Sequence, residues 1–378
     1  MYHVKTINKI SKIGLAELDD RFEISDTMEH EDAILVRSAK LHDYDFPAEL
    51  LCIARAGAGV NNIPLDRAAE AGIVVFNTPG ANANGVKELT IAALLLASRK
   101  ISQGITWVKE QAAAGADVAA VVEKGKAAYV GPEIQGKTLG VVGLGAIGVL
   151  VANAAAALGM QIVGYDPFLS VQHALNLTPG VKVVSTLEEL YGQADYISLH
   201  LPMTPETKGT LNDAAFAAMK DGVRIVNLAR GELVDTEALK AALASGKCAA
   251  YVTDFPNSET AAMEGVVAIP HLGASTPESE DNCAMMAARQ VRDYLDNGNI
   301  VNSVNLPVLS MAWAAKNRVC VLTKGADAAA IAAAVPAVAS ASKTRGEYGY
   351  FLLDTDAQVD TAAIAALPGV LRVRVLHQ

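Results

Sequence analysis

Several features that would point to a particular cellular environment are scarce in this sequence. The 378 residues include four cysteines, Cys52, Cys248, Cys283 and Cys320, and none of them forms a CxxC pair or a zinc-binding pattern with histidine. Disulfides are therefore not expected, and free buried thiols fit a reducing cytoplasm. The longest apolar runs, such as IAALLLA, are too short to span a bilayer, and the first residues contain no apolar segment typical of a secretory signal.

An excess of positive charge is also absent, since the formal net charge is -10. This balance disfavours nucleic acid as a partner, because binding to a phosphate backbone needs a basic surface. An anionic small molecule would have to be attracted by locally placed arginine or lysine. Aromatic residues make up 5% of the chain and hydrophobic residues 51%, so cores of Ala, Val, Leu and Ile in two or three domains are expected.

Short apolar runs that alternate with helical patterns dominate the middle of the chain. Residues 137–271 contain seven of them, TLGVVG, MQIVGYD, VKVVS, DYISLHLP, VRIVNLAR, AAYVTDF and VVAIPH. Continuous apolar strands separated by helices predict an α/β fold with a doubly wound parallel sheet. Such sheets bind ligands beyond the carboxyl ends of their strands, where most of the polar candidates lie.

The flanking segments predict two further domains. Three apolar strands, AILVRS, LLCIARAG and GIVVFNTPG, precede an apolar helix, KELTIAALLLASRK, and another helix is expected over 277–297. We expect one domain of residues 1–98 plus 281–305 and a nucleotide-binding domain of residues 99–280. Residues 317–378 predict a small βαββαβ domain, because GYFLLDTD and LRVRVL alternate as half-buried strands do. A low-complexity linker is the alternative for the alanine-rich part of this tail.

The segment GLGAIG, residues 143–148, matches the GxGxxG pattern between the strand TLGVV and the helix AIGVLVANAAAALG. In this context Gly143 permits a tight turn, Gly145 lets a pyrophosphate approach the backbone, and Gly148 allows close packing of helix and strand. The N–H groups of Ala146 and Ile147 would face the phosphates. The segment therefore predicts a dinucleotide site.

Asp166 ends the next predicted strand, 18 residues past Gly148. An acid in this place accepts hydrogen bonds from the ribose hydroxyls and repels a 2′-phosphate. Pro167 and Phe168 follow, so no arginine is present there to bind that phosphate. The pattern predicts NAD rather than NADP as the cofactor, with an ordinary strand-end turn residue as the alternative interpretation of Asp166.

An enzyme that oxidises an alcohol with NAD needs a base, and histidine is suited to this role near neutral pH. His200 and His271 each end a strand of the predicted sheet; His271, with glycine nearby, is the preferred base, and His200 fits a hydrogen-bonded structural histidine. Arg230 ends another strand and could bind a substrate carboxylate through two hydrogen bonds. The alternative is a surface ion pair of Arg230 with Glu232 or Asp235.

Five segments occur together in one order, namely RAGAGVNNI, NTPGANANGVKEL, VVGLGAIG, LARGELVD and PHLGAST. Over about residues 33–305 they make the chain resemble the D-2-hydroxyacid dehydrogenase family, most of all its phosphoglycerate-oxidising members. The resemblance implies a Rossmann NAD domain, a flavodoxin-like substrate domain and NAD-dependent oxidation of 3-phosphoglycerate in L-serine biosynthesis. The alternatives are another 2-hydroxy acid, such as glycerate or hydroxypyruvate, and a non-catalytic, NAD-sensing protein similar to a corepressor.

The resemblance implies a catalytic set of Arg230, Glu259 and His271, in which the glutamate stabilises the imidazolium. It places Glu259 five residues after Asp254, which is implied to face the nicotinamide amide. Where the family has LDVF followed by EEP, this chain has TDFPNSE, and the loop to His271 is short. Glu264 is therefore the alternative partner of His271.

The same resemblance implies further contacts by position. Cofactor contacts are implied for His200, Pro202, Leu228, Ala229, Gly273 and Ala274. Substrate contacts are implied for Arg37, Ser38, Arg55, Gly57, Gly59 and Asn82. For Arg37 and Arg55 the alternative is pairing with local carboxylates.

The tail resembles an ACT module but has TKGADAAAI in place of the serine-sensing motif, so serine binding stays open. A homo-oligomer, dimer or tetramer, is expected because the helix over residues 85–100 is apolar nearly all round. Burial of that helix within one subunit is the alternative.

Overall fold

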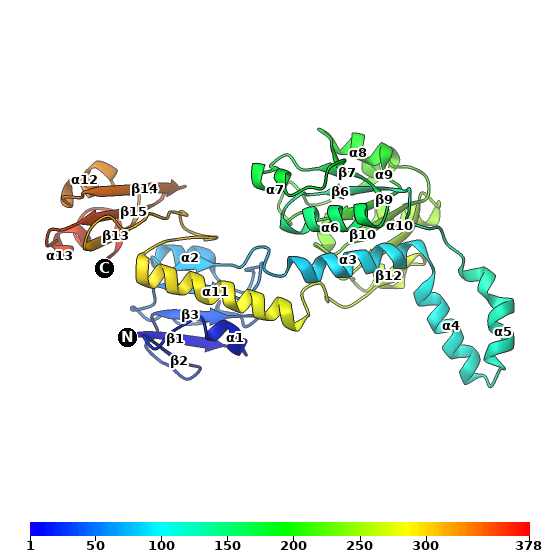
Figure 1. Cartoon of the computed structure of the whole chain (residues 1–378), viewed down its shortest axis with the longest axis horizontal. Helices are drawn as coiled ribbons and strands as arrows, with labels where there is room; N and C mark the ends of the chain where they lie inside the picture. Colours follow the sequence, from blue (N-terminus) through cyan, green and yellow to red (C-terminus); the bar gives the residue numbers. More distant parts are fainter. The chain divides into compact units, whose positions relative to one another are not determined.

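The computed structural model describes all 378 residues, and the chain forms two compact units (Figure 1). The first unit comprises Met1–Asn82 and Pro277–Gln378, and the second comprises Ala83–Thr276. The second unit therefore begins with α3 (Ala83–Ser98), ahead of the boundary expected after residue 98, because α3 packs against strands and a helix of this unit. None of the helices combines the length and the apolar character that a transmembrane span requires.

The second unit is built on a seven-stranded parallel sheet in the order β12-β11-β10-β9-β6-β7-β8. Its strands are β6 (Thr138–Val142), β7 (Gln161–Tyr165), β8 (Lys182–Val183), β9 (Tyr196–Leu199), β10 (Val223–Asn227), β11 (Cys248–Thr253) and β12 (Val266–Ala268). They coincide with the seven apolar runs, so the predicted doubly wound Rossmann sheet is confirmed. The strand order reverses between β6 and β9, which is the switch point where such sheets bind ligands.

Most helices of this unit begin at a side chain that caps them. The helices are α6 (Ala146–Ala157), α7 (Val171–Leu175), α8 (Leu187–Gln193), α9 (Asp213–Ala218) and α10 (Thr236–Ala244), with the 3₁₀ turns η2 (Gly231–Leu233) and η3 (Thr260–Ala262). Ser170, Thr186, Asn212 and Asp235 each accept a backbone N–H at the start of α7 to α10. Helix α6 starts at Gly145 without a side-chain cap. Its first N–H groups are therefore left for another partner.

Helix α3 packs against α6, β10 and β11 and buries Val86, Ala93, Leu94 and Ala97. Its apolar character is thus largely explained by burial within its own unit, which was the alternative interpretation.

A helical hairpin follows α3 and was not predicted from the sequence. It consists of α4 (Ile101–Ala113), α5 (Val118–Gly125) and the 3₁₀ turn η1 (Lys126–Tyr129), and no residue of these three elements is buried. The rings of Trp107 and Tyr129 pack at 5.5 Å between centroids and join α4 to η1. Ile101 and Ile105 remain exposed on α4.

The first unit contains a five-stranded parallel sheet in the order β2-β1-β3-β4-β5. Its strands are β1 (Tyr2–Ile7), β2 (Phe22–Ser25), β3 (Ala33–Val36), β4 (Cys52–Arg55) and β5 (Val74–Phe76), and its helices are α1 (Lys12–Leu15), α2 (Leu65–Glu70) and α11 (Pro277–Asn297). This strand order is that of flavodoxin-like folds, as expected. The three predicted strands, β3 to β5, are confirmed, whereas β1 and β2 were not predicted.

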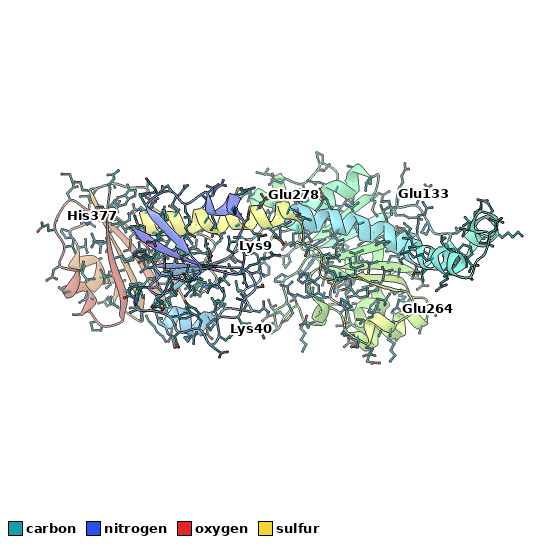
Figure 2. All side chains as sticks on the ribbon, turned by 90° about the horizontal axis from the view of Figure 1, so that it is seen from below. Lys9, Lys40, Glu133, Glu264, Glu278 and His377 are labelled. Carbon is teal, nitrogen blue, oxygen red and sulfur yellow. The ribbon has the colours of Figure 1, made fainter.

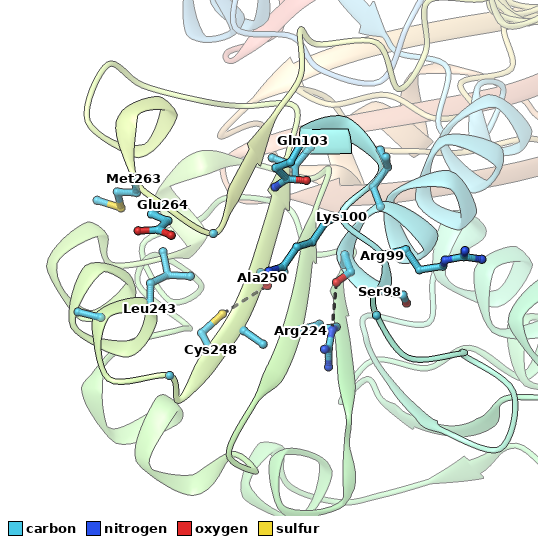
Figure 3. A pocket seen from close by; sticks show the side chains of 18 of the residues that line it. Ser98, Arg99, Lys100, Gln103, Arg224, Leu243, Cys248, Ala250, Met263 and Glu264 are labelled. Atoms are coloured by element: carbon cyan, nitrogen blue, oxygen red, sulfur yellow. Dashed lines mark hydrogen bonds between the residues drawn. The ribbon is translucent and has the colours of Figure 1, made fainter. Parts of the chain in front are cut away.

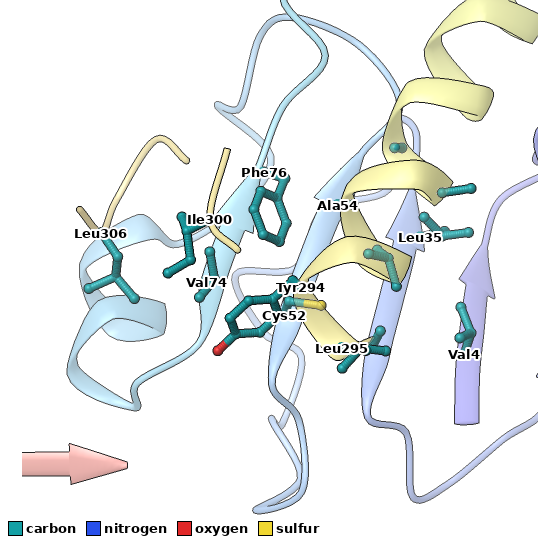
Figure 4. Packing of buried hydrophobic residues seen from close by; sticks show 14 of the residues in the cluster. Val4, Leu35, Cys52, Ala54, Val74, Phe76, Tyr294, Leu295, Ile300 and Leu306 are labelled. Carbon is teal, nitrogen blue, oxygen red and sulfur yellow. The ribbon is translucent and has the colours of Figure 1, made fainter. Parts of the chain in front are cut away.

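Helix α11 supplies much of the core of this unit. It packs on α1, β3 and β4, and Figure 4 shows its Tyr294 and Leu295 among side chains of the sheet. The rings of Tyr294 and Phe76 meet edge to face at 5.8 Å. The segment at the end of the predicted substrate domain is thus bound to its beginning by apolar burial.

The C-terminal residues form the predicted βαββαβ module, which lies in the first unit. Its elements are β13 (Asn317–Lys324), α12 (Ala328–Ala334), β14 (Ala339–Arg345), β15 (Tyr348–Thr355), α13 (Thr361–Ala365) and β16 (Val370–His377), and the antiparallel sheet has the order β14-β15-β13-β16. Val319 and Val321 of β13 pack with Ile331 and Ile364 of the two helices. The alternate residues of β13, such as Cys320, point to the opposite side and pack in the core that also contains residues of α11.

A fully buried ion pair fixes this module to the preceding chain. Arg318 and Asp354 are both 0% exposed, and two N–H groups of Arg318 reach the two carboxylate oxygens at 2.7 and 2.9 Å. The guanidinium also donates to the carbonyl oxygens of Asn297, Met311 and Ala312. Every donor is used, as a buried charge requires.

Asp354→Ala should destabilise the first unit by about 3–5 kcal/mol, because it leaves a buried guanidinium without its carboxylate. Urea unfolding of the full chain measures this as a lower midpoint. Glu123→Ala removes an exposed partner of Lys126 and serves as the control, with no shift expected. Equal midpoints for the two variants would contradict the role given to Arg318 and Asp354.

Candidate active site

The glycine-rich turn between β6 and α6 fits a bound pyrophosphate. Gly143 has φ +94°, and a Cβ there would lie 2.7 Å from the carbonyl oxygen of His200. A Cβ at Gly148 would lie 1.9 Å from the carbonyl oxygen of Gly143. A Cβ at Gly145 would meet no atom within 4 Å. The protein's own packing thus requires two of the glycines, and the open side of Gly145 leaves space for a ligand.

The start of α6 provides donors for that ligand. Gly145 precedes the helix without a capping side chain, so the N–H groups of Ala146 and Ile147 have no partner within the helix. A helix of this length adds a partial positive charge at its start. Both features favour a phosphate group next to Gly145.

The carboxylate of Asp166 lies beside this turn. One oxygen accepts the N–H of Leu144 at 2.9 Å, and the other accepts the N–H of Phe168 at 2.8 Å. Each oxygen keeps a lone pair that can accept a ribose hydroxyl. Asp166 forms no ion pair, and the exposed residue Phe168, rather than an arginine that could bind a 2′-phosphate, follows Pro167. The arrangement fits NAD.

Four polar residues follow the ends of neighbouring strands in the same sheet. His200, Arg230, Asp254 and His271 come after β9, β10, β11 and β12, which are adjacent in the order β12-β11-β10-β9. Parallel strands place their carboxyl ends at one edge, so these residues share the edge that holds the glycine-rich turn.

His200 is held as a structural residue. Its Nε2 atom lies 2.9 Å from the hydroxyl of Ser198. Burial lowers the pKa of His200 to about 4, so the ring is neutral at physiological pH. These contacts fit the sequence-based interpretation of His200 as a hydrogen-bonded histidine.

The guanidinium of Arg230 has no anionic partner in the chain. Its Nη1 atom donates to the carbonyl oxygen of Ala229 at 2.6 Å, and it forms no ion pair with Glu232 or Asp235. Asp235 instead accepts the N–H of Ala238 at the start of α10. The surface ion pair named as the alternative for Arg230 is therefore not formed, and donors remain for a carboxylate ligand.

Asp254 is buried beside the segment that carries His271. The residue is only 1% exposed. One carboxylate oxygen accepts the N–H of Gly273 at 3.2 Å, and the other is buried without a partner. Burial raises the pKa of Asp254, and the Gly273 N–H and the nearby His271 act against that rise. An orphaned acceptor of this kind fits a ligand amide.

The Phe255 ring contacts both Arg230 and His271. The centroid of its ring lies 4.3 Å from that of the His271 imidazole. The guanidinium carbon of Arg230 lies 5.2 Å from the same ring centroid. Sequence reasoning missed Phe255, although its place directly after the strand-ending Asp254 was the available signal.

Glu259 is held away from the imidazole by Lys240. Its carboxylate lies 3.3 Å from the Lys240 ammonium and forms no ion pair with His271. The side chain of Asn257 accepts the N–H groups of Glu259 and Thr260, which turns the loop back toward the start of β12. The implied pairing of Glu259 with His271 is thus not formed in this arrangement, because the loop directs the glutamate to α10.

Glu259 and Glu264 both line a cavity of about 1000 Å³ together with Lys240 and Met263 (Figure 3). Figure 2 shows Glu264 at the surface, and it too makes no ion pair with His271. Arg224 near the start of β10, Cys248 at the start of β11 and Gly265 just before β12 line the same cavity, so it lies at the amino ends of the strands. It is distinct from the edge that carries Arg230 and His271.

The other cofactor candidates lie at the carboxyl ends as well. They are Pro202 and Leu228, which follow β9 and β10, Ala229, whose N–H donates to the Asn227 side chain, Gly273, which contacts Asp254, and Ala274.

The substrate candidates lie in the first unit, at or after the ends of β3, β4 and β5. The Nε of Arg55 donates to the Arg37 carbonyl oxygen at 3.1 Å, and its guanidinium lies against Gly57. The N–H of Gly57 donates to the Arg55 carbonyl oxygen at 2.9 Å. Arg37 pairs with Glu280 at 2.5 Å, which is the local pairing named as the alternative.

Two buried acceptors in the segment after β5 have no partner, the hydroxyl of Thr78 and the amide oxygen of Asn82. Ser38 donates its N–H to the Asn8 side chain at 3.0 Å, and Gly59 follows in the loop after β4. Thr78 was not predicted; its N–H donates to the Gly57 carbonyl oxygen, which places it beside the predicted set. Unused polar atoms of this kind suit a polar ligand.

Residues 91–273 match the family described as D-isomer specific 2-hydroxyacid dehydrogenase, NAD binding domain. This part of the chain is therefore a D-2-hydroxyacid dehydrogenase NAD-binding domain. D-3-phosphoglycerate dehydrogenase of Rattus norvegicus is 38% identical over 291 residues, which are 75% of this chain and 52% of the rat protein. The chain spans about half the length of the curated relatives it matches.

Two solved structures have the same architecture. One is the cofactor (NAD+) bound 3-phosphoglycerate dehydrogenase of Entamoeba histolytica, with 28% identity and a TM-score of 0.61 over 82% of this chain and 99% of that one. The other is a glyoxylate reductase from Paecilomyes thermophila, with 28% identity and a TM-score of 0.66 over 80% and 98%. The prediction that NAD is the cofactor is confirmed, in agreement with the geometry at Gly145 and Asp166.

Gly145→Val should raise the dissociation constant for NADH by at least about 10-fold, which is about 1.4 kcal/mol. A Cβ at this position meets no protein atom, so a loss of binding would arise because the side chain occupies space that the ligand needs. Titration of NADH fluorescence measures it. Gly192→Val in α8 also enters open space and serves as the control. Equal affinity in both variants would place the pyrophosphate elsewhere.

Proposed function

We propose that this protein oxidises D-3-phosphoglycerate to 3-phosphohydroxypyruvate with NAD+, the reaction that leads to L-serine. The main support is that Arg230, which has no ion pair, and His271 both contact the Phe255 ring. They do so at the edge of the sheet that holds the glycine-rich turn. Curated relatives 35–40% identical to the chain are D-3-phosphoglycerate dehydrogenases, which supports this substrate.

In this proposal, different residues of the chain bind the substrate and accept the proton from the hydroxyl at C2. Arg230 binds the substrate carboxylate through two hydrogen bonds and so fixes the reacting carbon. His271 accepts the proton of the C2 hydroxyl. NAD+, when bound, accepts the hydride that leaves C2. The unpartnered oxygen of Asp254 would accept an N–H of the cofactor's carboxamide.

We infer that Glu259 supports the imidazolium of His271, as the family resemblance implies. It must first leave Lys240, and an exposed ion pair of this kind is weak enough to exchange. Glu264 remains the second candidate for this role.

Recognition of the phosphate is assigned to the first unit. A trianionic substrate needs local positive charge on a chain whose net charge is -10. We propose Arg55 as the main phosphate ligand. Arg37 becomes available once it exchanges its ion pair with Glu280 for one with the substrate. Ser38, Gly57, Gly59 and Asn82 are proposed as the polar contacts around it.

Two other functions remain as alternatives. The glyoxylate reductase relative supports an unphosphorylated 2-hydroxy or 2-oxo acid, such as glycerate or hydroxypyruvate. The second alternative is a non-catalytic NAD-sensing protein, in which Arg230 without an ion pair would have no role.

Arg55→Ala should raise KM for 3-phosphoglycerate by about 10- to 100-fold and leave KM for glycerate within about 3-fold, because only the phosphate loses a charge-assisted hydrogen bond. The measurement is NADH formation by wild type and variant with 3-phosphoglycerate, glycerate, lactate and 2-hydroxyglutarate. Arg21→Ala, which removes an exposed arginine paired with Asp19 and Asp296, is the control.

Preferred turnover of glycerate by wild type would favour the unphosphorylated alternative. Full activity in His271→Gln would rule out the base assigned here. No turnover of any 2-hydroxy acid, together with NADH binding, would favour the sensing protein.

The remaining assignments concern assembly and location. We infer a homo-oligomer, dimer or tetramer, because the α4–α5 hairpin exposes Ile101 and Ile105 and buries no residue. Sedimentation of the full chain should give at least twice the monomer mass of 39.4 kDa, and a monomer at micromolar concentration would contradict it. We propose that the βαββαβ module is ACT-like. Four free, buried cysteines support a reducing cytoplasm.

A further inference from the structure

Phe255 lies just past the end of β11, between the segments that carry Arg230 and His271. It follows β11, and β11 lies between β10 and β12, the strands that end before Arg230 and His271. Its ring contacts the imidazole at 4.3 Å, with 47° between the ring planes, and the guanidinium at 5.2 Å. Tilted aromatic pairs and a cation over an aromatic face are both attractive arrangements.

The backbone of Phe255 is anchored. Its N–H donates to the hydroxyl of Thr253 at 3.0 Å, and Thr253 is 0% exposed. The ring therefore starts from a fixed point at the end of a buried strand.

Few other groups restrain the two catalytic side chains. The imidazole of His271 makes no ion pair and no hydrogen bond through its ring; only its carbonyl oxygen accepts a bond, from Ser275. Arg230 makes a single side-chain hydrogen bond, to its neighbour Ala229. Phe255 is the only aromatic residue in contact with either of them.

We propose that Phe255 is a positioning residue, whose ring holds the Arg230 guanidinium and the His271 imidazole in one relative geometry for the reaction at C2. The inference rests on the proposed dehydrogenase function. The substrate's carboxylate meets Arg230 and its hydroxyl meets His271, so the distance between the two side chains sets whether both contacts form at once. A misplacement of about 1 Å at such a site can cost about 100-fold in rate.

The test compares Phe255→Leu and Phe255→Tyr in the full chain, with Phe216→Leu as the matched control. Phe216 is buried in the core of the same unit and contacts neither catalytic residue, so its replacement also removes a ring. The readouts are kcat, KM for the best 2-hydroxy acid, the dissociation constant of NADH and the unfolding temperature.

Phe255→Leu should lower kcat by about 10- to 100-fold with unchanged NADH affinity. Phe255→Tyr should stay within about 3-fold of wild type, since it keeps the ring and Phe255 is partly exposed. Phe216→Leu should lower the unfolding temperature and leave kcat unchanged. Wild-type kcat in Phe255→Leu, or an equal loss in Phe255→Tyr, overturns the proposal.

A second readout does not need turnover and separates this inference from the proposed function. The imidazole proton resonances of His271 should lose a ring-current shift in Phe255→Leu and keep it in Phe255→Tyr and Phe216→Leu. If wild type turns over no 2-hydroxy acid, the function fails while this comparison still decides the placement. Unchanged His271 resonances in Phe255→Leu overturn the placement.

Discussion

The parallel register of β9 to β12 is the constraint on which the candidate site depends. Backbone pairing aligns Asn227 of β10 with Leu199 of β9 and with Thr253 of β11, and Thr253 with Ala268 of β12. The chain therefore leaves all four strands at one edge. Arg230, Phe255 and His271 are distant in the sequence. They lie together because each follows a strand that ends at this edge.

The same edge of the second unit also carries several polar groups that lack partners. The N–H groups at the start of α6 are uncapped, Asp254 has a buried oxygen without a donor, and Arg230 has no anion. Unsatisfied groups of this kind are costly in a folded protein unless a ligand completes them. The buried pair of Arg318 and Asp354, by contrast, satisfies its charges within the chain.

The sequence predicted those parts of the fold in which one residue pattern permits one structure. The strands β6 to β12 were identifiable because apolar runs alternate with helical segments. Strand β1 was missed because YHVKTI mixes polar and apolar residues, and the α4–α5 hairpin because it buries no residue and so carries no clear apolar face. The glycine turn and Asp166 were predicted because backbone space and charge determine them.

The position of Glu259 could not be predicted, since a loop and not a strand carries it. Asn257 and Lys240 decide its direction, and neither had a role in the sequence pattern. Phe255 was missed for a different reason. An aromatic residue at the end of a buried strand resembles any core residue until the neighbouring strands are known, and only the order β12-β11-β10 places it between Arg230 and His271.

The most direct test of the account is a crystal structure of the full chain with NADH and oxalate, an unreactive analogue of a 2-oxo acid. The account predicts that the guanidinium of Arg230 binds one oxalate carboxylate at about 2.9 Å and that the His271 imidazole contacts another oxalate oxygen. The Phe255 ring should touch both side chains. Oxalate bound away from Arg230, or Arg230 paired with a carboxylate of the protein itself, would contradict the central claim.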